Sequence, residues 1–157
     1  MDELENQVNQ IISAVINELA ENYLKKLCEY IEKYVYNPKE PKQYKRTYEF
    51  LNSFQKLPQA KKVMKEFIQE IYFDSNKLTY KEQPSGLWQY GVAGSNYTTR
   101  MAEILNNETL NKQYSQVKGA LNIGTNGYYW EEFLKYIDDN ITRDIKTGFI
   151  KRGVMLK

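Results

Sequence analysis

Apolar residues recur every three or four positions through the first quarter of the chain, from Leu4 to Val35. This spacing predicts one apolar stripe along a helix over residues 2–36. Acidic residues in the first turn oppose the positive end of the helix dipole, and Pro38 follows its end. At about 1.5 Å per residue the helix is roughly 50 Å long. Part of its stripe is therefore expected to reach a neighbouring subunit.

A second helical stripe closes the chain. Trp130, Phe133, Ile137 and their successors at the same spacing predict a helix that starts near residue 128. Gly148 is expected to end it, because glycine favours the left-handed conformation of many helix ends. The basic residues 149–157 are expected to form a C-terminal arm.

The middle of the chain has weaker patterns. Residues 44–54 predict a short helix that runs into a strand. Residues 60–80 fit a helix or a strand, and the β-rich ending favours a strand over 66–73, a turn at 74–76 and a return strand at 78–80. A glycine-containing loop is expected at 83–96 and a helix at 97–106.

These elements predict an α+β fold, in which a long N-terminal helix and a C-terminal helix pack on a small antiparallel sheet. Repeats, low-complexity tracts and linkers are lacking, so residues 1–157 are expected to form a single domain.

Tyrosine is the unusual component: the 157 residues include fourteen Tyr, six Phe and two Trp. Tyrosine suits surfaces that are apolar at one edge and wet at the other, so the excess fits extensive interfaces and, equally, a tyrosine-rich core. The net charge of +2 creates no strong field for nucleic acid or an acidic membrane.

Candidate chemistry is sparse. The chain has no His and a single Cys, Cys28, which excludes an intrachain disulfide and the usual Ser-His-Asp and Cys-His catalysis. We expect no enzyme, no cofactor and no metal. The polar, acidic start is unlike a secretory signal, and apolar runs are short, which predicts a protein made in a cytoplasm without a membrane span.

Two groups of carboxylates are candidate metal sites. Asp138, Asp139 and Asp144, together with Glu131 and Glu132, fit the solvent face of a helix better than a magnesium site. Glu70, Asp74 and Lys77 fit a nuclease-type cluster only remotely.

Basic residues alternate with tyrosines at Lys42, Tyr44, Lys45, Arg46 and Tyr48. Charge and stacking of this kind favour nucleic acid, and Lys151 and Arg152 of the tail would add phosphate contacts. Ordinary solvated side chains are the alternative interpretation. The five residues expected to contact DNA in a channel are Lys42, Lys45, Arg46, Lys151 and Arg152.

The segment YKRTYEFLNSF, residues 44–54, resembles the Arg-Thr-x-x-Leu-x-Ser segment of minor structural proteins of tailed bacteriophages, the tail-component or tail-completion family. Arg46, Thr47, Leu51, Asn52 and Ser53 carry the resemblance. The order of a long helix, this motif, a strand and turn at 70–80 and an aromatic C-terminal helix is also similar. Tyr48 stands where the family usually has glycine.

The resemblance implies a virion component at the head–tail junction or tail end, a neck, tail-completion or tail-terminator subunit. Such a protein forms a homo-oligomeric ring, contacts other neck or tail proteins and is made in the host bacterial cytoplasm. Residues expected at interfaces are Tyr44, Arg46, Tyr48, Trp88, Tyr90, Tyr97 and Phe149. A small regulatory or inhibitor protein of phage origin is the alternative, and a metal-dependent nuclease a remote one.

Overall fold

A computed structural model describes residues 3–36, 48–78 and 129–155. The first element is helix α1 (Glu3–Ile31), which continues into a π-helical turn, η1 (Glu32–Tyr36). The helix predicted over residues 2–36 is confirmed throughout its described part. Tyr23, Leu27, Ile31 and Val35 are buried at steps of four. Steps of four drift by about 40° around an α-helix, and the wider π turn counters this drift so that the last residue stays on the core side.

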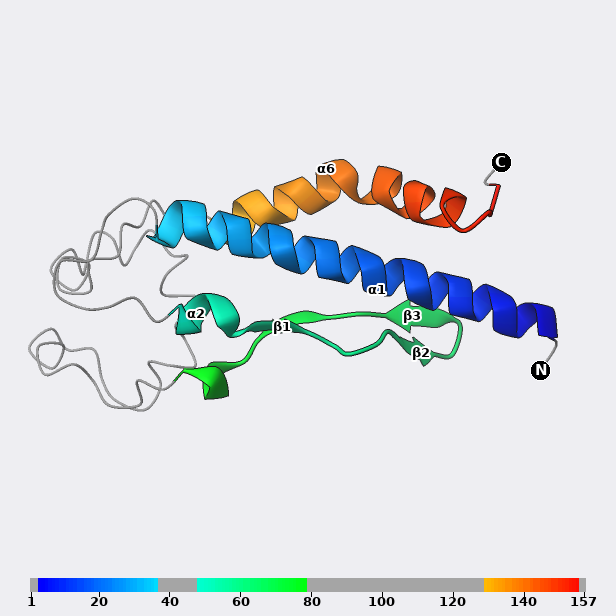
Figure 1. Ribbon diagram of the computed structural model, residues 1–157, viewed down its shortest axis with the longest axis horizontal. Helices are drawn as coiled ribbons and strands as arrows, with labels where there is room; N and C mark the ends of the chain where they lie inside the picture. The colour runs from blue at the N-terminus through cyan, green and yellow to red at the C-terminus, as the bar shows by residue number, and fades with distance from the viewer. Residues whose placement is uncertain (1–2, 37–47, 79–128, 156–157) are drawn as a thin grey trace, which may run out of the picture.

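Helix α6 (Tyr129–Ile150) lies antiparallel to α1 and packs along it (Figure 1). Its end is a glycine cap at Gly153, whose φ is 77°. The Gly153 N–H donates to the Ile150 carbonyl at 2.9 Å, and the Val154 N–H donates to the Phe149 carbonyl at 3.1 Å. These two bonds satisfy carbonyls that the last helical turn would leave unpaired.

The prediction that Gly148 ends this helix was wrong, because the helix continues past it. Gly148 instead faces α1, where an added Cβ atom would lie 2.8 Å from Cγ1 of Val15. The glycine is therefore needed for close approach of the two helices.

A long, interrupted β-hairpin lies on the other side of α1 from α6 (Figure 1). Strand β1 (Phe54–Lys56) pairs with β4 (Ile71–Phe73), and β2 (Lys61–Val63) pairs with β3 (Glu66–Ile68), both antiparallel. Between the two ladders, the Leu57 N–H donates to the Glu70 carbonyl at 3.0 Å.

The hairpin corrects two sequence predictions. The strand expected over 66–73 is divided at Gln69, whose side-chain amide donates to Oδ1 of Asn17 on α1 at 2.8 Å. The expected return strand at 78–80 is wrong at Leu78, which is extended but fully buried outside the ladders. The partner of β4 is β1, upstream in the sequence. Residues 79 and 80 lie outside the described part of the chain.

Two short helices lie at the open end of the hairpin, where β1 begins and β4 ends. They are α2 (Glu49–Asn52) and the 3-10 helix η2 (Ser75–Lys77), so the short helix leading into a strand and the turn at 74–76 are confirmed within the described residues. The buried Ser53 hydroxyl donates to the Glu49 carbonyl at 2.6 Å, and the Asp74 N–H donates to the Ser53 carbonyl at 2.8 Å. Ser53 thereby ties α2 to the end of the hairpin.

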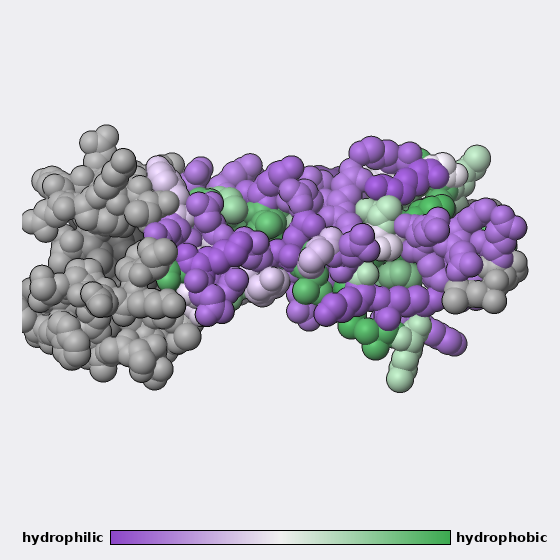
Figure 2. Space-filling model, turned by 60° about the horizontal axis from the view of Figure 1, so that its bottom comes forward, coloured by the Kyte–Doolittle hydropathy of each residue, from purple (hydrophilic) through white to green (hydrophobic). Residues whose placement is uncertain are grey.

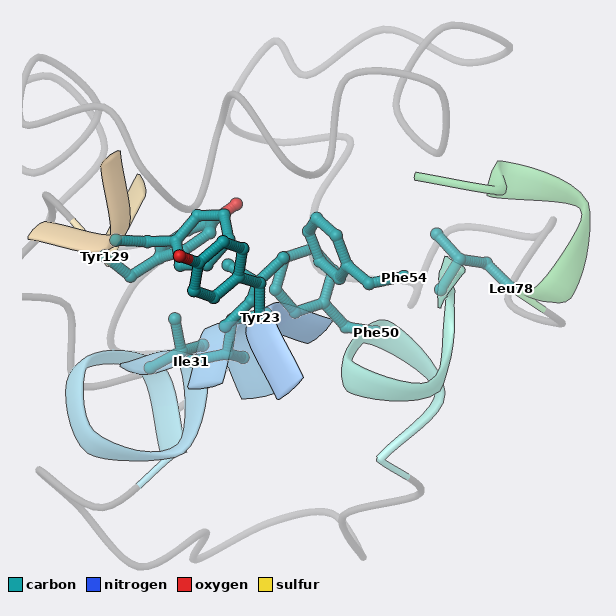
Figure 3. Packing of buried hydrophobic residues seen from close by; sticks show 9 residues of the cluster. Tyr23, Ile31, Phe50, Phe54, Leu78 and Tyr129 are labelled. Atoms are coloured by element: carbon teal, nitrogen blue, oxygen red, sulfur yellow. The ribbon is translucent and has the colours of Figure 1, made fainter. Parts of the chain in front are cut away.

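The core collects where α1, α2, β1 and α6 meet (Figure 3). The rings of Phe50, Phe54 and Tyr129 pack edge to face, with centroids 5.3 to 6.3 Å apart. Ile31 and Leu78 close this cluster from α1 and the end of the hairpin. The α+β fold with two helices and a small antiparallel sheet is confirmed.

Candidate assembly surface

The hairpin ends in an apolar protrusion. Val63 pairs with Glu66, so only Met64 and Lys65 connect β2 to β3. The Met64 side chain is 92% exposed and that of Val63 is 49% exposed. Figure 2 shows apolar side chains standing out from the otherwise hydrophilic lower edge of the molecule. We call Val63, Met64 and Lys65 the hairpin tip.

Met64 has an unfavourable backbone conformation. Its φ is 55°, in the region where glycine and asparagine are favoured at two-residue hairpin turns. A residue with a Cβ atom pays about 1–2 kcal/mol there relative to glycine. Burial does not offset this cost in the subunit, since the side chain is almost fully exposed. The two-residue turn requires a positive φ at this position, and a methionine there instead of glycine motivates a functional hypothesis for its exposed side chain.

Lysines surround the hairpin tip. Lys62 pairs with Glu5 of α1 at 3.4 Å, and its ammonium group lies 5.8 Å from the centre of the Phe67 ring. Over the described ranges, Lys61 and Lys65 form no ion pair. The tip is therefore a basic, apolar knob.

A second exposed apolar surface lies at the start of α1. Leu4 is 64% exposed and Val8 46% exposed, and α1 extends beyond the ends of both α6 and the hairpin (Figure 1). We call residues 3–8 the α1 overhang. Its charged residues are acidic: Glu3 and Glu5 lie in the first turn. The sequence predicted that part of the long helix would reach past its own subunit, and it did not indicate at which end.

A groove of about 350 Å³ runs between α1 and α6. Inside it, the Tyr23 hydroxyl donates to Oδ2 of Asp144 at 3.2 Å, and Arg143 binds the other oxygen of that carboxylate at 2.9 Å. Burial, followed by the negative charge of Asp144, raises the pKa of Tyr23 to about 12. The side chains of Tyr23, Asp144 and Arg143 thus bind one another across the groove.

The C-terminal end of α6 is fastened to α1 through Glu18. Lys151 and Arg152 each donate to its carboxylate at 2.7 Å, and Arg152 also reaches the Ala14 carbonyl at 3.4 Å. Hydrogen bonds from the two cations hold the pKa of Glu18 below its ordinary value. Residues 149–152, expected in a C-terminal arm, instead form the end and cap of α6 and pack on α1.

This placement bears on two predicted sites. Lys151 and Arg152 were expected to contact DNA, and both are already ion-paired within the subunit. Phe149, expected at an interface, is half-buried in α6. Their roles toward partners stay predictions.

The carboxylates considered as metal ligands do not form a metal-binding cluster in the described part of the chain. Within the described ranges, no group of three or more His, Cys, Asp or Glu side chains is arranged to hold a metal ion. Asp74 accepts a hydrogen bond from the Asn76 N–H at 3.1 Å and so caps η2, rather than joining Glu70 in a cluster. None of the described helices is long and apolar enough to cross a membrane. Cys28 is half-buried, and burial raises the pKa of its thiol.

Tyr48 is the one residue of the predicted tyrosine and arginine interface set in residues 44–48 whose position is described. Its side chain is 42% exposed and its φ is 57°, the left-handed conformation that glycine favours. The other predicted interface and DNA-contact residues lie outside the described ranges: Lys42, Tyr44, Lys45, Arg46, Trp88, Tyr90 and Tyr97.

Sequence reasoning missed the hairpin tip. Lys61, Lys62 and Val63 show no alternation of apolar and polar residues, so strand β2 gave no periodic signal. The available clue was the apolar pair Val63 and Met64 between lysines.

Comparisons of the chain with family models, curated proteins and solved structures found no match.

Proposed function

We propose that this protein is a structural subunit that works by assembling with copies of itself, as a virion component of a tailed phage at the head–tail junction or tail end. The observation that carries the assembly role is the pair of exposed apolar surfaces at one end of the molecule. Exposed apolar side chains grouped at the end of an otherwise polar molecule are typical of interaction sites.

The geometry favours assembly over catalysis. In the groove between the helices, Tyr23 and Arg143 bind Asp144, and Lys151 binds Glu18. A catalytic site needs an activated group aimed at a substrate. The exposed Met64 side chain would be buried if a second molecule packed against the hairpin tip.

The virion assignment rests on the resemblance over residues 44–54. Two motif positions have a structural reason that agrees with the pattern. Ser53 is buried and joins α2 to the hairpin. Tyr48, at the position of the family's usual glycine, has a left-handed backbone of the kind that glycine favours. Both observations concern only the motif itself. The proposed position in the particle follows from the resemblance alone.

Two measurements test this proposal. Light scattering coupled to size-exclusion chromatography, with negative-stain images, is expected to show closed oligomers of the purified protein. Mass spectrometry of purified particles from the phage or prophage that encodes the chain is expected to detect it at a constant ratio to the capsid protein. Absence from the particles would overturn the virion assignment.

A further inference from the structure

We propose that the hairpin tip of one subunit docks on the α1 overhang of a second copy, in a head-to-tail contact. This inference rests on the proposed assembly function and names the two surfaces that meet. The argument depends on their direction, their charge and the strain at Met64.

The two surfaces lie on different sides of α1. Leu4 and Val8 precede Val15 by eleven and seven residues, which places all three on one side of the helix. Val15 faces Gly148 of α6, so the overhang continues the α6-facing side of α1. The hairpin packs on the other side (Figure 1).

A subunit with complementary surfaces on two sides can use both at once. One neighbour receives its hairpin tip, and another neighbour inserts a tip against its overhang. A contact of this kind joins unlike surfaces, so it repeats from copy to copy and closes into a ring when the rotation allows. The same two surfaces therefore suffice for a ring of identical subunits.

The charges of the two surfaces are complementary. The tip carries Lys65 with Lys61 beside it, and the overhang carries Glu3 and Glu5. Among the described residues, neither of those lysines nor Glu3 forms an ion pair inside the subunit. Within the subunit Lys62 already pairs with Glu5 at 3.4 Å, so Glu3 is the overhang carboxylate left for a lysine of the neighbour. Attraction between the basic hairpin tip and the acidic overhang determines which surfaces of two copies meet.

The hydrophobic part of the contact is an unbranched side chain against two aliphatic ones. Methionine adapts to irregular apolar surfaces, so Met64 is suited to pack between Leu4 and Val8 of the neighbour. Met64 has a φ that favours glycine. Replacing it by glycine therefore removes the side chain that assembly needs without harming the folding of the subunit.

The central experiment compares Met64→Gly with the parent protein by sedimentation velocity and by thermal unfolding at low concentration. Glycine relieves the backbone strain, so the isolated subunit is expected to be at least as stable as before. Self-association is expected to weaken by roughly tenfold or more, as for the loss of a buried anchor. Leu134→Ser on α6, which removes a side chain of 43% exposure away from both surfaces, is the matched control and is expected to leave association unchanged.

A mixing experiment tests the pairing of the surfaces. Met64→Glu and Val8→Glu proteins are each expected to be monomeric. Mixed, they are expected to form a one-to-one complex, because an intact tip meets an intact overhang once. Charge exchange adds a second test: Lys65→Glu weakens association, and Glu3→Lys in the same chain is expected to restore it.

Three results would overturn the inference. They are a parent protein that stays monomeric at concentrations up to about 1 mM, Met64→Gly oligomers of unchanged affinity, and no complex on mixing. If the protein is found in particles but its self-association does not depend on Met64, this contact is overturned and the proposed function stands. If the protein is absent from particles but its self-association depends on both surfaces, the virion assignment is overturned and this contact stands.

Discussion

Single residues set how closely the two long helices approach. At position 148 there is no space for a Cβ atom, because the short, stiff, branched side chain of Val15 lies against the glycine. A helical glycine normally costs about 1 kcal/mol relative to alanine. Here the missing methyl group is what permits the contact.

We therefore expect Gly148→Ala to destabilise the protein, because overpacking of about 1–3 kcal/mol exceeds the gain in helix propensity. In a Val15→Ala background the same change should be neutral or stabilising. Urea unfolding of the four proteins measures the coupling between the two sites. An equal effect of Gly148→Ala in both backgrounds would contradict the close contact.

The left-handed backbone of Tyr48 leads to a second residue-scale prediction. Tyr48→Gly should be more stable than Tyr48→Ala by about 1 kcal/mol, since only glycine adopts this φ without strain. At Lys25, inside α1, the order should reverse, because alanine is favoured in a helix interior. Chemical denaturation of the two pairs provides the comparison, and the same order at both sites would exclude strain at Tyr48.

At the scale of elements, Glu18 fastens the end of α6 to α1. A carboxylate whose pKa is lowered in the folded state adds stability above its ordinary pKa of 4.5, and this stability is lost as the pH falls through the lower folded value. Glu18→Gln should thus lower the melting temperature at pH 7, and the difference from the parent should vanish in acid.

Thermal unfolding between pH 7 and pH 3 checks this expectation. Glu70→Gln is the control, because the Glu70 carboxylate forms no ion pair with a described residue. A gap between parent and Glu18→Gln that persists in acid would mean that the glutamate acts through packing and not through charge.

How far the sequence predicted these elements depended on the strength of the periodic signal. α1 and α6 have many turns and a repeated apolar stripe, so their existence and approximate ends were clear. The end of α6 was misplaced because Gly148 and Gly153 are both suitable caps, and only packing against Val15 assigns the first to the helix interior.

The hairpin was harder to predict, since its strands have three residues each and its pairing joins β1 to β4 across fifteen to nineteen positions. Local pattern carries no information on such a partner. The same reason hid the hairpin tip: exposure and a positive φ at Met64 exist only in the folded chain. Helix length alone predicted that part of α1 would reach past its own domain, but not at which end.

At the scale of the whole molecule, self-association is expected to couple to stability. If copies assemble through the hairpin tip, the melting temperature of the parent should rise with protein concentration by mass action. The Met64→Gly protein should lose most of this dependence. Differential scanning calorimetry over a hundredfold concentration range measures both, and an equal slope for the two proteins would contradict the coupling.

The antiparallel course of α1 and α6 has a practical consequence. Residues 3 and 155 emerge at the same end of the molecule, the end that holds the hairpin tip and the α1 overhang (Figure 1). An affinity tag or fluorescent protein fused to either terminus is therefore placed beside the surfaces where copies would meet. A fusion that blocks assembly would imitate a damaged interface, so tags removed by protease before measurement are the right choice for this chain.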